Sequence, residues 1–192
     1  PSTSIEATAQ IAEIISALTS VRPRKPLNAI YPCIAFSTIM PGADTTPPLW
    51  AEDRARQCLN RANLELGYRP PCYGLITGLD HLADISQMVA MSDASRDQKP
   101  FGVMLKSGND PLEEKLSEAF QGLHRSICDA QLDLISDLHD PEAVSHILRA
   151  PLQLAVVEKS LITFFSDLVS PMPPLRQPID LQGLFFVGTK VK

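Results

Sequence analysis

Two nearly uncharged, strand-like segments that flank a helix constrain the fold of this chain more than any other feature. Leu27 to Ser37 (LNAIYPCIAFS) and Pro70 to Ile76 (PPCYGLI) lack charged residues and are rich in residues that favour strands. Such runs are typical of strands that are buried on both faces of a parallel sheet. A strand, a helix and a second strand at this spacing predict a βαβ unit with a right-handed crossover.

Pro32 conflicts with a continuous strand from Leu27 to Ser37. Proline has no backbone N–H to donate to a neighbouring strand, so we expect one flank of the strand to be unpaired or bulged there. The helix that follows is clearer: Thr46 is its predicted N-cap, Pro47 its first helical residue, and Gly67 ends it.

The rest of the chain is predicted to be mainly helical. A first helix is expected from Ile5 to Thr19. Residues 84–108 are expected to be polar and irregular around a short apolar segment. Apolar residues then recur every three or four positions from Leu112 to Leu138, which predicts a long amphipathic helix. A short helix is expected to start at Pro141, and another to run from Pro151 through Val169.

The order of these elements predicts an α/β fold with a parallel sheet flanked by helices. The proline-rich segment from Ser170 to Pro178 leads into a final strand, Leu181 to Val187. We therefore divide the chain into an α/β part (1–108), a helical-hairpin insertion (109–170), and a linker with the strand that completes the sheet (171–192).

Charge and composition exclude several classes of function. The chain has 17 basic and 22 acidic side chains, a formal net charge of −5, and no cluster of Lys and Arg. A nucleic acid or an anionic membrane surface would need a basic face, so we expect neither as a partner. No apolar stretch approaches the roughly 18–20 residues that span a bilayer. Because the sequence begins with Pro1, without a methionine or a signal peptide, we expect a piece of a longer chain.

The four cysteines, Cys33, Cys58, Cys72 and Cys128, have no CxxC spacing and lie among apolar residues. We interpret them as small core residues in a reducing compartment, with zinc or disulfide roles as the lesser alternatives. His124 and Cys128 share a helix face, but two ligands without a third are weak support for zinc. We therefore expect no metal site.

No complete catalytic motif is present. The nearest match to a phosphate-binding loop, Gly183 to Lys190, has its Thr and Lys in the wrong order and strand residues as spacers. Thr77-Gly78-Leu79-Asp80 is a sharper candidate, because it ends a strand of a parallel sheet, where ligands bind. GTP-binding domains place (Asn/Thr)-Lys-x-Asp there. The carboxylate of Asp80 is suited to bind the edge of a guanine base, but Gly78 stands where the motif has the lysine that covers the guanine ring. The alternative is that Asp80 only stabilises a loop or caps a helix.

Six acidic side chains lie on the predicted outer side of the long helix. They are more typical of a solvated face than of an acid–base pair, because no apolar pocket separates their pKa values. They are also our candidate docking surface for a protein partner. The six are Glu113, Glu114, Glu118, Asp129, Asp133 and Asp137.

Five segments resemble the IcmF/TssM family, in the order and spacing of that family, from about residue 5 to 190. Arg22 to Ile30 (RPRKPLNAI) is similar to the family's RPRRPLNGV, and Leu66 to Leu82 (LGYRPPCYGLITGLDHL) is similar to its LGVRLPVYVLFTKLDLL. Three further segments resemble the family in the same register: Lys99 to Leu105, Ala150 to Leu168, and Leu181 to Gly188.

The resemblance implies the second half of a cytoplasmic, P-loop-GTPase-like domain. The family's members are large inner-membrane scaffold proteins of bacterial type VI secretion, with relatives in type IVB secretion. The phosphate loop and the Mg²⁺-binding Asp would lie upstream. The family's Thr-Lys-Leu-Asp falls on Thr77 to Asp80, so that only its lysine is lost, and a second base-contacting segment falls near Lys190. Thr77, Asp80 and Lys190 would then be remnants of a base-recognition site.

On this resemblance we expect a structural, protein-interaction module with a degenerate nucleotide site, no catalytic residue, no cofactor and no enzymatic activity. Its partners would be a DotU/TssL-like membrane protein and cytoplasmic baseplate proteins, at the cytoplasmic face of the bacterial inner membrane. One alternative is the nucleotide-binding half of a GTPase or ATPase that needs an upstream phosphate loop. The other is an unrelated soluble α/β enzyme.

Overall fold

The computed structural model describes residues 2–40, 49–93, 100–136 and 138–188. These residues form the predicted α/β fold, with four strands in the order β1–β2–β4–β3. β1 (Cys33–Ala35), β2 (Cys72–Thr77) and β4 (Leu181–Val187) run parallel, as predicted. β3 (Gly102–Met104), a strand that was not predicted, pairs antiparallel with β4 at the far edge, so the sheet is mixed and mostly parallel.

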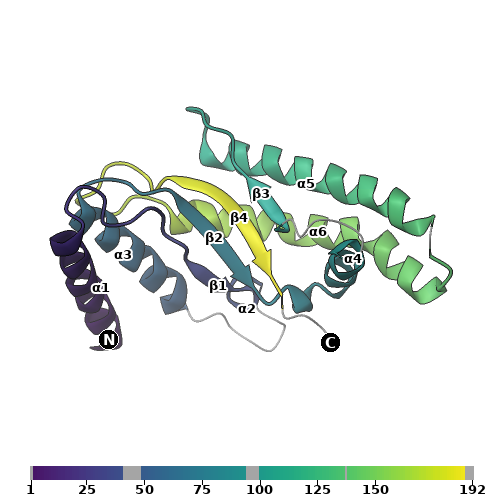
Figure 1. Cartoon of the computed structure of the whole chain (residues 1–192), viewed down its shortest axis with the longest axis horizontal. Helices are drawn as coiled ribbons and strands as arrows, with labels where there is room; N and C mark the ends of the chain where they lie inside the picture. The colour runs from purple at the N-terminus through teal and green to yellow at the C-terminus, as the bar shows by residue number, and fades with distance from the viewer. Residues whose placement is uncertain (1, 41–48, 94–99, 137, 189–192) are drawn as a thin grey trace.

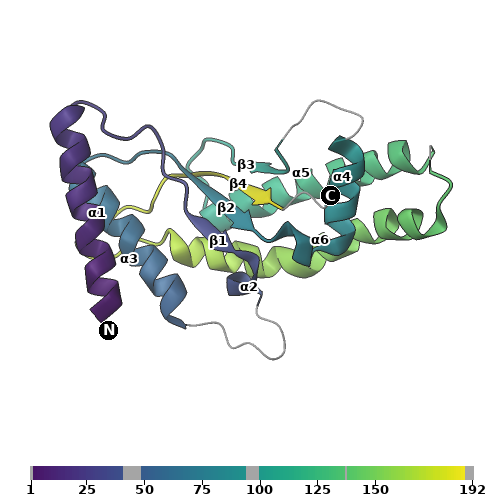
Figure 2. The same cartoon turned by 60° about the horizontal axis from the view of Figure 1, so that its bottom comes forward.

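Helices lie along one face of the sheet and at both ends of the molecule (Figures 1 and 2). The helices are α1 (Ser2–Val21), α2 (Phe36–Ile39), α3 (Leu49–Leu66), the 3₁₀ helix η1 (Leu79–His81), α4 (Ala83–Asp93), α5 (Leu112–Ile135) and α6 (Pro141–Leu168). In Figure 1 α6 runs behind the strands, and it packs against α3, α4 and α5. α1 packs against α3 at one end. None of the described helices is long and apolar enough to cross a membrane.

α6 supplies the centre of the hydrophobic core. Its Ile147, Leu154, Leu161 and Phe165 have no exposed surface. A Cβ atom on Gly74 of β2 would lie only 2.6 Å from the Phe165 ring. The glycine therefore lets the C-terminal half of α6 lie directly on the sheet.

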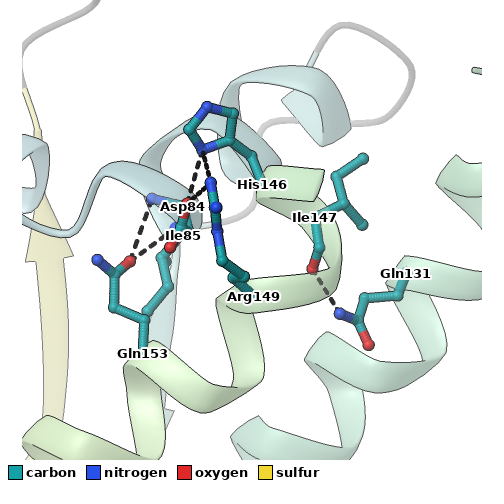
Figure 3. A network of polar contacts seen from close by, with 7 residues as sticks. All are labelled: Asp84, Ile85, Gln131, His146, Ile147, Arg149 and Gln153. Atoms are coloured by element: carbon teal, nitrogen blue, oxygen red, sulfur yellow. Dashed lines mark hydrogen bonds and ion pairs between the residues drawn. The ribbon is translucent and has the colours of Figure 1, made fainter. Parts of the chain in front are cut away.

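α6 continues through Pro151, so the prediction of two separate helices is wrong. Proline has no N–H to donate to the carbonyl of residue 147, its acceptor one turn earlier. The side chain of Gln131 in α5 takes this place, because its Nε2 donates to the Ile147 carbonyl (Figure 3). Ile147 is fully buried, so this bond pairs a carbonyl that would otherwise be unsatisfied. α5 thus supplies the hydrogen-bond donor that α6 lacks at Pro151.

The strand predicted over 27–37 is much shorter in the structure. An isolated bridge at Ile30 precedes Pro32, and β1 starts only after Pro32. This interruption confirms the expectation for a proline that cannot donate to the ladder. From Phe36 the chain becomes α2, because Phe36 and Ile39 are buried three residues apart, which is a helical spacing.

The prediction that residues 84–108 are irregular is also wrong, because they contain α4 and β3. The backbone amides of Asp84 and Ile85, in the first turn of α4, both donate to Gln153 Oε1 of α6 at 3.1 Å. This cap comes from a residue 69 positions away, so it leaves no local signal in the sequence.

The other predicted helices are present as α1, α3 and α5. α3 ends before Gly67, which has the expected positive φ of 68°. The predicted start of this helix, Thr46 and Pro47, lies outside the described residues. The division of the chain at residues 108 and 170 stays a prediction.

Gln131→Met keeps the length of the side chain and removes its donor. We expect this change to lower the free energy of unfolding by about 1–3 kcal/mol, because the Ile147 carbonyl is then buried without a partner. In a Pro151→Ala background the alanine N–H pairs with that carbonyl, and the cost should fall below about 1 kcal/mol. Urea denaturation of the four proteins in this cycle measures the coupling. Equal costs in the two backgrounds would contradict the role given to Gln131.

Candidate functional site

The carboxyl ends of the three parallel strands meet at one edge of the sheet. Ala35 of β1 and Val187 of β4 both lie beside Thr77 of β2. Open α/β sheets bind their ligands at this edge. Two of the predicted site residues, Thr77 and Asp80, are located here, and the third, Lys190, lies outside the described residues.

The chain leaves β2 through a turn that requires glycine. Gly78 has φ 89° and ψ 39°, in the left-handed region, and its N–H donates to the Val187 carbonyl at 3.0 Å. The His81 N–H donates in turn to the Gly78 carbonyl at 3.0 Å. A Cβ atom on residue 78 would lie 3.0 Å from His81 Cδ2. A lysine at this position would therefore be strained in its backbone and crowded at its first side-chain atom.

The imidazole of His81 lies where a side chain on residue 78 would begin. Its ring stacks on the buried Phe36 ring, with centroids 6.2 Å apart and planes 17° apart. The surface beside Gly78 is thus built by a histidine and a phenylalanine, and neither can supply the lysine cation of the GTPase motif.

Thr77 and Asp80 differ in whether their side chains are free to bind a ligand. The Thr77 hydroxyl donates to the Ile34 carbonyl of β1 at 3.4 Å, a long bond that ties two strand ends together. Asp80 is exposed in η1, and among the described residues its carboxylate has no hydrogen bond or ion pair. The edge therefore presents an exposed carboxylate next to a glycine turn in which a lysine would be strained.

Two open cavities lie at the opposite edge, where the strands begin. They have volumes of about 460 and 420 Å³, lie between α3 and the proline-rich segment before β4, and share Leu64, Pro174 and Leu175. Asn60 of α3 fixes this segment, because its Oδ1 accepts a bond from the Met172 N–H at 3.1 Å. Neither cavity is at the edge where an α/β sheet binds ligands.

The acidic side chains of α5 point to solvent, as predicted. Glu118 forms an ion pair with Lys106, and the exposed Arg125 lies between the two ends of the acidic face. The described members of the face are all exposed: Glu113, Glu114, Glu118, Asp129 and Asp133. Asp137 lies outside the described residues. A docking role for this face stays a prediction.

A polar network between α4 and α6 was not predicted (Figure 3). His146 Nδ1 lies 2.6 Å from Asp84 Oδ1, and an Arg149 nitrogen lies 3.3 Å from the same oxygen. The spacing of His146, Arg149 and Gln153 by three and four residues places them on one face of α6, which is the only sequence signal for the network. It joins α4 to α6, and we assign it a structural role.

The cysteines differ in their burial. Cys72 is fully buried, Cys58 and Cys128 are partly buried, and all four thiols are free. The prediction of core cysteines is therefore right for Cys72 and wrong for Cys33, which is exposed on β1. Burial raises the pKa of the Cys58 thiol, and it raises that of Cys72 to about 12, with a smaller contribution from Asp180.

Metal-ligating side chains do not gather in the part of the chain that the structure describes. No group of three or more His, Cys, Asp or Glu residues comes together there. Cys128 Sγ and His124 Nδ1 do lie 3.7 Å apart on α5, which leaves the pair of potential ligands without a third.

A family model described as the IcmF-related N-terminal domain matches residues 6–192. No curated protein and no solved structure matches the chain.

Two glycines with positive φ, Gly67 after α3 and Gly78 after β2, separate the effect of backbone strain from that of crowding. We expect Gly67→Ala to lower the free energy of unfolding by about 1 kcal/mol, because φ is 68° and no atom lies within 4 Å of the new Cβ. Gly78→Ala should cost at least about 1 kcal/mol more, since its Cβ also meets His81. In a His81→Ala background the extra cost should vanish. Urea denaturation checks this, and equal costs for the two glycines would show that His81 does not fill the space beside Gly78.

Proposed function

Because the chain belongs to the IcmF-related family, whose N-terminal domain it matches over residues 6–192, we propose that it is a protein-interaction module of a bacterial secretion scaffold. In this proposal it is part of the cytoplasmic domain of an inner-membrane protein of a type VI, or type IVB, secretion system. It holds other components in place and does not turn over a substrate.

The conformation of Gly78 carries the argument for a degenerate nucleotide site. A GTPase motif needs a lysine between the threonine and the aspartate, and its aliphatic stem covers the base. Here the turn has φ 89°, which disfavours any side chain, and His81 lies 3.0 Å from the Cβ position. Thr77 and Asp80 match the motif in the sequence, whereas position 78 between them does not supply the lysine that covers the base.

The acidic face of α5 supports a role in protein interaction. Exposed carboxylates at Glu113, Glu114 and Asp129 create a negative surface on a helix whose opposite side is anchored by the buried Leu116 and Phe120. Such a surface steers and orients a basic partner, and salt weakens its attraction. We propose that it contacts the DotU/TssL-like membrane partner or cytoplasmic baseplate proteins, at the cytoplasmic face of the inner membrane.

A second candidate function rests on Asp80. Its carboxylate is exposed at the ligand-binding edge and, among the described residues, is unpaired. This favours a nucleotide-binding half that works together with an upstream phosphate loop. Because the lysine of the motif is missing, nucleotide binding is less well supported than the role as an interaction module.

Calorimetric titration with GTP and with ATP distinguishes these functions. We expect no measurable binding of either nucleotide to the chain in the presence of Mg²⁺, because Gly78 stands where the motif has its lysine and the sequence contains no complete phosphate-loop motif. Asp80→Ala should leave the titration unchanged. Micromolar binding that Asp80→Ala abolishes would contradict the scaffold proposal and favour the nucleotide-binding half.

Charge reversal tests the acidic face. The variant Glu113→Lys/Glu114→Lys/Asp129→Lys should weaken binding of the cytoplasmic domain of the DotU/TssL-like partner by at least about tenfold at low salt, as charge complementarity is lost. A control with the same change in net charge carries Glu13→Lys, Asp53→Lys and Asp167→Lys on α1, α3 and α6, and should bind within about twofold of the wild type. Biolayer interferometry measures both. If the two variants bind alike, the acidic face is not the docking surface.

A further inference from the structure

The two cavities between α3 and the proline-rich segment form one groove along α3. They share Leu64, Pro174 and Leu175, so they are neighbours with common walls. The first cavity extends to Asn60 and Met172, and the second extends past the C-terminal end of α3. Figures 1 and 2 show α1 and α3 side by side at this end of the molecule. The volumes of about 460 and 420 Å³ are in the range of sites that enclose a small ligand.

Hydrogen bonds hold both walls of the groove in place. The Met172 N–H donates to Asn60 Oδ1 at 3.1 Å, and the Leu175 N–H donates to the Met172 carbonyl at 2.8 Å. The Tyr68 hydroxyl accepts from the Leu27 N–H at 2.9 Å and donates to the Leu27 carbonyl at 2.5 Å. The groove is therefore formed before a ligand binds, which lowers the cost of ordering it.

The two ends of the groove differ in chemistry. The first cavity has an apolar wall that includes Ala9, Met172 and Pro173. The second cavity ends at Arg69 and Arg176, which are exposed, and among the described residues neither guanidinium has an acidic partner. No acidic side chain is among the described residues that line either cavity. The groove thus leads from an apolar region to two free cations.

The end of the molecule that carries the groove is positive, although the whole chain has a net charge of −5. Arg61 in the first cavity is paired with Glu65 of the same helix, so the free cations are confined to the other end of the groove. Residues 22–25 contain three further exposed cations and precede the segment that Tyr68 holds at the second cavity. These charges are far apart in the sequence, and only the fold brings them together. Two guanidinium groups are suited to bind a carboxylate.

Asn63 contributes a buried acceptor to the same cavity. The residue is 5% exposed, and its Nδ2 donates to the Leu59 carbonyl at 3.0 Å. Its Oδ1 is buried and has no donor in the part of the chain that the structure describes. A buried acceptor without a donor costs free energy, which a ligand N–H placed against Asn63 would recover. The groove therefore fits a ligand that carries an N–H close to its carboxylate.

We propose that the groove binds the C-terminal end of a partner protein whose last residues are apolar. The terminal carboxylate binds Arg69 and Arg176, and a peptide N–H next to it donates to Asn63 Oδ1. The apolar side chains lie against Leu64 and Leu175, which both cavities share. This inference deepens the proposed function, on which it rests, because it names a second surface of the interaction module and the chemistry of the partner that it takes.

Two observations favour the end of another chain as the occupant. A fatty acid has a carboxylate and an apolar part, but it has no N–H for Asn63. The groove lies where the strands begin, whereas the described chain leaves β4 at the opposite edge of the sheet, after Val187 (Figure 1). Cavities of this size admit an extended chain end and not the folded surface of a second copy.

A fluorescein-labelled peptide, Ser-Gly-Ser-Gly-Leu-Leu with a free carboxyl end, tests the proposal in fluorescence anisotropy. We expect saturable binding that Arg69→Gln/Arg176→Gln weakens by at least about tenfold, because the carboxylate loses both partners. Both arginines are exposed, so the variant should fold. Arg125→Gln/Lys159→Gln is the matched control, because it removes the same charge from exposed positions on α5 and α6, and it should bind within about twofold of the wild type.

Three altered ligands identify the groups that are recognised. The same peptide with an amidated end should bind at least about tenfold more weakly, and so should decanoate, measured by displacement of the labelled peptide. A peptide with an ester in place of the last amide has no N–H there and should bind about three- to tenfold more weakly. On Asn63→Leu, which has no acceptor, the ester and the amide should bind within about twofold of each other.

Absence of saturable binding, an equal loss in the Arg125→Gln/Lys159→Gln control, or equal affinity for the amidated peptide would overturn the proposal. Equal affinity for the ester on the wild type would overturn the pairing with Asn63, and equal affinity for decanoate would favour a lipid acyl chain instead. None of these results depends on nucleotide binding or on the acidic face of α5. Failure of this proposal is therefore distinguishable from failure of the proposed function.

Discussion

A single side-chain hydrogen bond allows one helix to join the two halves of this molecule. Gln131 pairs the Ile147 carbonyl that Pro151 leaves without its usual partner, and α6 therefore runs unbroken from Pro141 to Leu168. The N-terminal half of α6 contacts α4 and α5, and its C-terminal half lies on the sheet through Phe165. A break at Pro151 would free these halves from each other, and the sheet and the helical pair would no longer share one core.

The sequence predicts those parts of the fold that local pattern determines. The uncharged runs around Cys33 and Cys72 indicate the parallel strands, and the apolar periodicity after Leu112 indicates α5. The missed features depend on distant residues: Gln131 completes α6 across 16 positions, and Gln153 caps α4 across 69. Burial is also a tertiary property. Cys33 and Cys72 therefore differ in exposure although their sequence surroundings are similar.

The candidate site shows the same limit. The position of Thr77 and Asp80 follows from the end of a strand, so the sequence places both at the ligand-binding edge. The stacking of His81 on Phe36 beside Gly78 follows from the turn geometry, which the sequence motif does not contain. The strand order is also a tertiary property, because pairing between strands that are distant in the sequence places α3 and α6 against each other.

Amide hydrogen exchange at the residues after Pro151 tests the unbroken α6 most directly. In the structure the N–H groups of Leu152, Gln153 and Leu154 donate to carbonyls one turn earlier. Residue-resolved NMR should therefore find them protected within about tenfold of the amides of Val157 and Leu161 in the same helix. If a new helix began at Pro151, these three amides would be unpaired first-turn groups. Exchange near the rate of an unfolded peptide at all three would contradict the account.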